Sequence, residues 1–257
     1  ALSTAPIAAA ASSPLDAAVV DYEAGLVGIF QNDSRYGANG TSFDAGDVAQ
    51  NDNVYPAQRI SLQLRFLDRH EVRGTYAPLD LTTRTTLAEG LNFNSVVFAA
   101  GDVVDFRYLF DGTRLTYLYH LVRGERWTVA AGGLFQLRNA RVAVTEIGGK
   151  REASESDIGP VGALAAMARY TRPGGVWGQF DAAGFSTFGI PNGLVGAVWD
   201  VALTLGVPLA ESTDLTFRLR YYGGGADVPS ADLKNWGQFG FALMGLRVDL
   251  PTLLARR

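Results

Sequence analysis

Two histidines and a series of arginines are the side chains of this sequence best suited to chemistry. His120 follows Arg114 and Thr116 on the same alternating positions, whereas His70 lies in a short polar segment. A catalytic histidine needs a nucleophile and an orienting acid within hydrogen-bond reach. The chain contains no G-x-S-x-G motif. We therefore expect no enzymatic activity, and a lipid-active enzyme built around His120 stays open as an alternative.

The arginines alternate with apolar residues, which predicts a basic inward face on several strands. This face comprises Arg59, Arg65, Arg73, Arg107, Arg114, His120, Arg218 and Arg220, with the acidic partners Glu71, Asp105, Asp181 and Asp200. Guanidinium groups suit carboxylates and phosphates, and a ring of them selects for anions. Small residues are expected on the facing wall: Ala130, Gly132, Gly196, Ala202 and Gly206. One alternative is a channel along the basic wall. The other is a closed interior in which the arginines fill the space and pair with the acids.

The elements that carry these residues alternate between polar and apolar positions from about residue 55 to residue 250. Ile60, Leu62 and Leu64, for example, interleave with Ser61 and Gln63. A period of two is typical of strands with one apolar face, and many such strands predict a barrel. Aromatic residues near the expected strand ends would suit a membrane interface: Trp127, Tyr108, Phe110, Tyr221 and Trp236. A soluble barrel or sandwich also alternates, but its core would not hold so many charges.

Four short polar junctions, near residues 68–70, 123–126, 172–175 and 211–213, predict tight turns at one end. Outer-membrane barrels place short turns on the periplasmic side and long loops outside, so the strands between two such turns must be even in number. Residues 71–122 satisfy this rule if 100–102 is a fifth short turn and Asp111-Gly112 is a tight external hairpin. The expected strands are then 19–30, 56–67, 71–81, 92–99, 103–110, 113–122, 127–144, 159–171, 176–187, 194–208, 214–222 and 236–250. We thus predict an all-β fold, a single antiparallel transmembrane β-barrel of about 12 strands with both termini periplasmic, with 10 to 14 strands open.

Composition excludes several classes of protein. The 257 residues include no cysteine, which rules out disulfides and cysteine-based metal or redox sites. The net charge of −4 gives no case for nucleic-acid binding. No apolar run is long enough for a membrane-spanning helix. The acidic first loop, residues 32–53, lacks the spacing of a calcium-binding EF-hand. We expect no cofactor and no metal.

The alternation resembles that of Gram-negative outer-membrane β-barrel proteins, and generically that of monomeric twelve-stranded channels. The ending with Gly245, Val248 and Leu250 resembles their insertion signal, although Leu250 replaces the usual aromatic residue. The resemblance implies a location in the cell outer membrane, contact with lipid and lipopolysaccharide, and barrel-insertion machinery as a partner. Residues 1–18 would be a periplasmic tail or lumen segment, residues 19–250 the barrel, and residues 251–257 a C-terminal tail.

This resemblance favours passive uptake of a small polar or anionic solute through the basic-walled lumen. The alternative function is that of a structural or partner-binding barrel with a sealed lumen, acting through loops 32–54 and 223–235.

Overall fold

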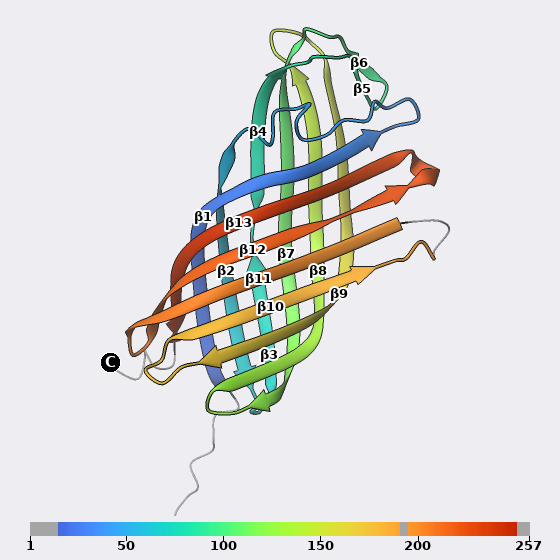
Figure 1. Ribbon diagram of the computed structural model, residues 1–257. Helices are drawn as coiled ribbons and strands as arrows, with labels where there is room; N and C mark the ends of the chain where they lie inside the picture. Colours follow the sequence, from blue (N-terminus) through green and yellow to red (C-terminus); the bar gives the residue numbers. More distant parts are fainter. Residues whose placement is uncertain (1–14, 191–194, 251–257) are drawn as a thin grey trace, which may run out of the picture.

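The computed structural model describes residues 15–190 and 195–250, which form a closed antiparallel barrel (Figure 1). Its strands are β1 (Leu15–Tyr36), β2 (Val54–Phe66), β3 (His70–Tyr76), β4 (Leu79–Thr86), β5 (Leu91–Phe93), β6 (Val96–Phe98), β7 (Val103–Arg123), β8 (Trp127–Glu146), β9 (Glu152–Thr171), β10 (Trp177–Ser186), β11 (Val195–Ala210), β12 (Thr213–Val228) and β13 (Leu233–Asp249). A 3-10 turn, η1 (Pro229–Ala231), precedes β13. The expected C-terminal tail, 251–257, and residues 1–14 of the expected N-terminal segment 1–18 lie outside the described residues. Residues 15–18 of that segment belong to β1.

Ten strands form the ring, in the order β1, β2, β3, β7, β8, β9, β10, β11, β12, β13 and back to β1. β3 and β4 lie in line against β7, because the pairs Tyr76–Thr113 and Leu79–Phe110 keep one register. Pro78 separates them, since proline has no N–H to give to a sheet ladder. The ring therefore has fewer strands than the expected number of about twelve, and its ten strands lie at the lower end of the predicted range of 10 to 14.

The predicted external hairpin at Asp111-Gly112 is also wrong, because β7 runs through both residues and pairs there with Arg138 and Asn139 of β8. The turn expected at 100–102 exists, but it lies between β6 and β7, on the side opposite the short turns. Strand parity is satisfied instead because β3 and β4 together count as one ring strand and β7 is the second, while the β5–β6 hairpin stands outside the ring. The four other short turns all join ring strands at one end, where Val19 of β1 also pairs with Asp249 of β13.

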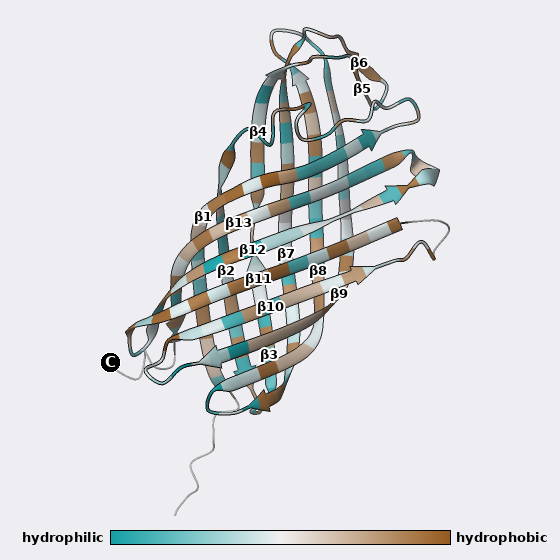
Figure 2. Ribbon diagram, in the orientation of Figure 1, coloured by the Kyte–Doolittle hydropathy of each residue, from teal (hydrophilic) through white to brown (hydrophobic). Residues whose placement is uncertain are grey.

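β7 explains why the sequence suggested a turn. Its lower half, from Gly112 to Arg123, turns Leu115 and Tyr117 outward and the polar Arg114 and His120 inward. Its upper half does the reverse, since Phe106 is buried while Arg107 is exposed. The polarity of the two faces inverts along one continuous strand. Figure 2 shows hydrophilic and hydrophobic residues alternating along the upright strands. Tyr108 and Phe110, expected at an interface, instead lie on this inward face.

The upper end of the barrel contains the main apolar core. The segment between β1 and β2 folds into it, placing Phe43, Ala45 and Val48 against the strands. The Phe43 ring meets the Phe106 ring edge-on at 5.3 Å between centroids. Thr83 of β4 donates a hydrogen bond to the carbonyl of Val48 at 2.7 Å. The segment with Val48 thus covers the place where β2 and β4 are not paired with each other.

β9 and β10 also separate from each other toward the upper end of the barrel. Their ladder runs from Thr171–Trp177 to Leu164–Gly184 and ends there. In the described part of the chain, β9 continues upward to Glu152 paired with β8 alone. In Figure 1, β9 stands upright at the back and β10 leans away to the right, so the two strands form a wedge. Within the described residues, no helix is long and apolar enough to cross a membrane.

Candidate functional site

Two features inside the barrel could carry function, a charged layer in the lower half and a cavity above it. We define the charged layer as the inward side chains Asp21, Glu23, Arg59, Gln63, Glu71, Arg73, Arg114, His120, Arg169, Gln179, Asp181, Asp200, Arg218, Arg220 and Arg247. They lie on the polar face of the same alternation that turns apolar residues outward.

Glu23 shows how the layer is built between neighbouring strands. β1 and β2 pair Glu23 with Arg59, whose guanidinium donates to Oε2 at 2.6 Å. Arg218 of β12 donates to the other oxygen, Oε1, at 2.7 Å. Charge-assisted hydrogen bonds of this kind are the strong ones, and a buried carboxylate requires them.

Other ion pairs cross the lumen between distant parts of the ring. Arg73 of β3 reaches Asp181 of β10, with 3.2 Å between Nη1 and Oδ1. Arg114 of β7 binds Asp200 of β11, and Arg220 holds the same carboxylate through two hydrogen bonds of 2.8 Å. The space left among these side chains is about 70 Å³. The layer therefore ties opposite walls together across the lumen.

His120 belongs to this layer. Its imidazole is 1% exposed and its Nε2 lies 3.0 Å from Oε2 of Glu71, which also accepts hydrogen bonds from Gln63 and Arg73. The other ring nitrogen, Nδ1, has no hydrogen-bond partner in the described part of the chain. Glu71 thus occupies the place that the acid of a catalytic triad takes beside its histidine. No serine or threonine hydroxyl among the described side chains bonds to the His120 ring, so the nucleophile of a hydrolase is missing there.

The predicted basic face is inward at most of its positions. Arg59, Arg73, Arg114, Arg218 and Arg220 join the charged layer, as do the acids Glu71, Asp181 and Asp200. Arg65 also lies on the inward face of β2, near the turn after that strand.

Arg107 and Asp105 are placed differently, on the outer face of the upper barrel, where they pair with Asp80 and Arg84. Their predicted inward placement is wrong because an uninterrupted β7 puts 105 and 107 on the face opposite 114 and 120.

The prediction missed Asp21, Glu23, Arg169 and Arg247 of the layer. Asp21 and Glu23 could have been found, because they alternate with the outward Tyr22 and Leu26 on the first strand. These acids neutralise much of the basic wall. Whether any of the layer's side chains binds a solute stays a prediction.

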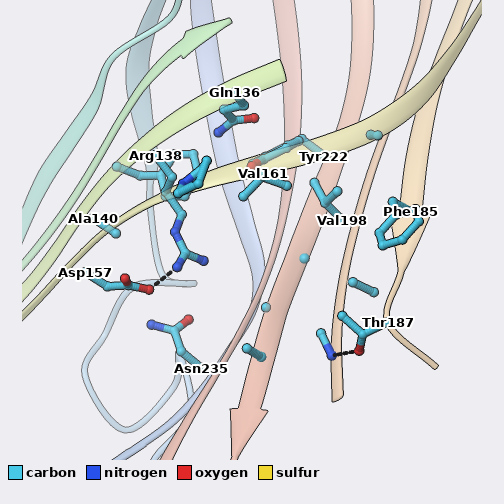
Figure 3. A pocket seen from close by; sticks show the side chains of 18 of the residues that line it. Gln136, Arg138, Ala140, Asp157, Val161, Phe185, Thr187, Val198, Tyr222 and Asn235 are labelled. Carbon is cyan, nitrogen blue, oxygen red and sulfur yellow. Dashed lines mark hydrogen bonds and ion pairs between the residues drawn. The ribbon is translucent and has the colours of Figure 1, made fainter. Parts of the chain in front are cut away.

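Above the layer lies a cavity of about 650 Å³, which we call the upper cavity (Figure 3). Most of its wall is apolar or glycine: Tyr108, Phe110, Ala140, Val142, Pro160, Val161, Gly162, Ala163, Leu164, Phe185, Gly196, Ala197, Val198, Tyr222, Gly224, Gly225, Ala226, Leu233 and Phe239. Its volume falls in the range of small-molecule sites, roughly 300–1,000 Å³.

The few polar groups of the upper cavity are mostly engaged with one another. Arg138 forms an ion pair with Asp157, and Asn235 donates a hydrogen bond to the hydroxyl of Tyr36. Gln136 differs, because it is 1% exposed and its Nε2 has no hydrogen-bond partner in the described structure. Figure 3 shows Gln136 beside Tyr222 and Val161 in this pocket.

Acidic residues at the upper end are held by neighbouring groups. Asp44 and Asp47 accept hydrogen bonds from backbone N–H groups of their own loop. Arg151 binds both Glu146 and Asp102, and its hydrogen bonds lower the pKa of the Glu146 carboxyl. No group of three or more metal-binding side chains occurs within residues 15–190 and 195–250.

No protein-family model matches the sequence, and no curated protein matches it either. Among solved structures, the outer membrane protease OmpT from Escherichia coli superposes with a TM-score of 0.51 at 9% identity, over 93% of this chain and 98% of that one. Ail of Yersinia pestis has a TM-score of 0.38 at 12% identity, over 90% of this chain and 99% of that one. The COG4313 outer membrane channel from Pseudomonas putida F1 has a TM-score of 0.38 at 14% identity, over 90% of this chain and 95% of that one. The chain has the fold of Gram-negative outer-membrane β-barrels.

Proposed function

We propose that the protein resides in the outer membrane of a Gram-negative bacterium and spans the lipid with the lower half of its barrel. The outward faces there are apolar around the ring: Leu26, Leu62, Leu115, Phe135, Leu164, Phe180, Leu203, Leu219 and Leu246. Outward aromatic pairs mark two levels, Trp127 with Tyr170 below and Trp199 with Trp236 above. Such girdles are typical of the two membrane interfaces.

In this proposal the lumen is closed at rest, and the protein acts from its external end. The ion pairs that cross the lumen, Arg73–Asp181 and Arg114–Asp200, are the observation that carries it. An arginine paired with a buried carboxylate is not free to bind a passing anion, and breaking the pair leaves an uncompensated charge. The geometry thus favours a sealed barrel with a ligand- or partner-binding outer end.

Uptake of a small polar or anionic solute is the second candidate. It is favoured by Arg65 and Arg169, which form no ion pair with a carboxylate among the salt bridges of the described residues. In this function the charged layer would have to open, and the unpaired arginines would attract the solute.

Single-channel recording in planar bilayers separates the two candidates. We expect no steady current from the wild-type protein. The double variant R73A/D181A, which removes one crossing pair, should conduct, whereas R107A/D80A, which removes an outer pair, should not. A steady, anion-selective current through the wild-type protein would overturn the closed lumen and support solute uptake.

A further inference from the structure

We propose that the upper cavity binds a single-chain amphiphile, a fatty-acid-like molecule, which enters sideways from the outer leaflet between β9 and β10. This inference rests on the proposed membrane placement, because the base of the wedge, at Gly184 opposite Trp199, then borders the outer leaflet. It goes beyond that proposal by assigning a ligand class and a route to the upper cavity.

The wall of the upper cavity selects for an apolar ligand. Phe110, Val161, Val198 and Phe239 line it, and glycines and alanines between them leave the space unfilled. The charges of Arg138 and Asp157 neutralise each other at one side. An apolar body in this space would remove hydrocarbon surface from water, at about 25 cal/mol per Å².

The floor of the upper cavity supplies a hydrogen-bond donor. Gln136 pairs across β8 and β7 with Arg114, a member of the charged layer, so it lies where the layer and the upper cavity meet. The guanidinium of Arg114 lies 4.7 Å from the centre of the Tyr222 ring, which also lines the cavity. The buried Nε2 of Gln136 has no partner among the described residues, and a buried donor without a partner costs about 1–3 kcal/mol. A ligand whose head group accepts a hydrogen bond would satisfy it.

The wedge between β9 and β10 offers the route. Above Leu164 the edge of β9 has no partner strand on this side among the described residues. Pro160 lies on this edge, and proline is tolerated in a sheet only where no neighbour needs its N–H. The other parting of the barrel, between β2 and β4, is filled by Phe43 and Val48 of the chain itself.

The rim of the wedge is apolar and exposed. Leu164 is 73% exposed and Ile190 81%, and Phe185 and Phe188 stand near them on the β10 side. Figure 3 shows Phe185 close to Val198 at this side of the pocket. Because open sheet edges are costly in hydrocarbon unless they border a protein cavity, this rim is where lipid and upper cavity would meet.

Photolabelling in lipid nanodiscs tests the proposal. A palmitate carrying a diazirine at its chain end should label cavity residues between 155 and 198 as well as outward residues of the barrel. Val198→Trp fills the cavity and should reduce the cavity labelling about tenfold. Val201→Trp, on the outward face of the same strand, should leave it unchanged. Labelling confined to outward residues, or equal in Val198→Trp and wild type, would overturn the proposed site.

A second comparison tests the head group. Gln136→Leu should weaken labelling by the palmitate probe about tenfold and leave labelling by an alkane probe of the same length unchanged. An equal loss for both probes would overturn the assignment of the head group to Gln136. Heat-modified mobility on gels confirms that each variant is folded. A conducting wild-type barrel would refute the closed lumen without altering these labelling patterns, so the two proposals fail separately.

Discussion

At the residue scale, the charged layer depends on carboxylates that each serve two or more donors. Asp200 accepts from Arg114 and Arg220, and Glu71 accepts from Gln63, Arg73 and His120. Removing one such carboxylate leaves buried guanidinium groups without a counter-charge. Replacing one of these carboxylates should therefore lower the stability of the barrel by more than a single ion pair contributes.

Asp200→Asn should lower the free energy of unfolding by about 3–5 kcal/mol, because two buried arginines lose their partner. Unfolding of the barrel from lipid vesicles by increasing concentrations of guanidinium chloride measures this change in free energy. Asp80→Asn is the control, since its partner Arg107 lies on the outer surface and such pairs contribute less than about 1 kcal/mol. Equal effects of the two variants would show that the layer does not hold the barrel together.

At the element scale, the ring requires close approach of β7 and β8. A Cβ added to Gly132 would lie 2.0 Å from the backbone oxygen of Tyr117, although the backbone of Gly132 is ordinary for a strand. Glycine is thus required there by space and not by conformation. The same cannot be said of Gly28, where a Cβ would meet nothing within 4 Å.

Gly132→Ala should destabilise the barrel by about 1–3 kcal/mol, the usual cost of overpacking. The midpoint of thermal unfolding in detergent reports the effect. Gly28→Ala should change the stability by less than about 1 kcal/mol. If both variants unfold at the wild-type midpoint, the strands do not approach as closely as described.

At the scale of the whole molecule, the barrel divides into two parts with opposite polarity. The lower part is apolar outside and charged inside, whereas the upper part holds Phe93, Phe98 and Phe106 inside and the pairs Arg84–Asp105 and Arg107–Asp80 outside. The proposed membrane placement accounts for this inversion, because water and lipid each select the outer face of the part that they would surround.

Arginine substitutions on the outer face should locate the boundary between these parts. Leu203→Arg, in the middle of the apolar band, should lower the free energy of unfolding in lipid vesicles by about 2–4 kcal/mol. Thr145→Arg, which faces outward near Asp105 and Glu152 in the upper part, should cost almost nothing. Refolding titrations compare the two, and similar costs would contradict the proposed membrane placement.

The sequence by itself determined the alternation, the inward or outward face of most strand residues and the short turns at one end. These features are local, since side chains two positions apart share a face whatever the strand pairs with. The same logic misled at Asp111-Gly112, where the inversion of polarity between the two faces of β7 imitated a turn.

Only the tertiary structure decided the ten-stranded ring, the pairing of Arg73 with Asp181 across the lumen, and the upper cavity beside the wedge. Each depends on registers between strands far apart in the chain. A strand's own residues do not specify what stands opposite them once the barrel closes.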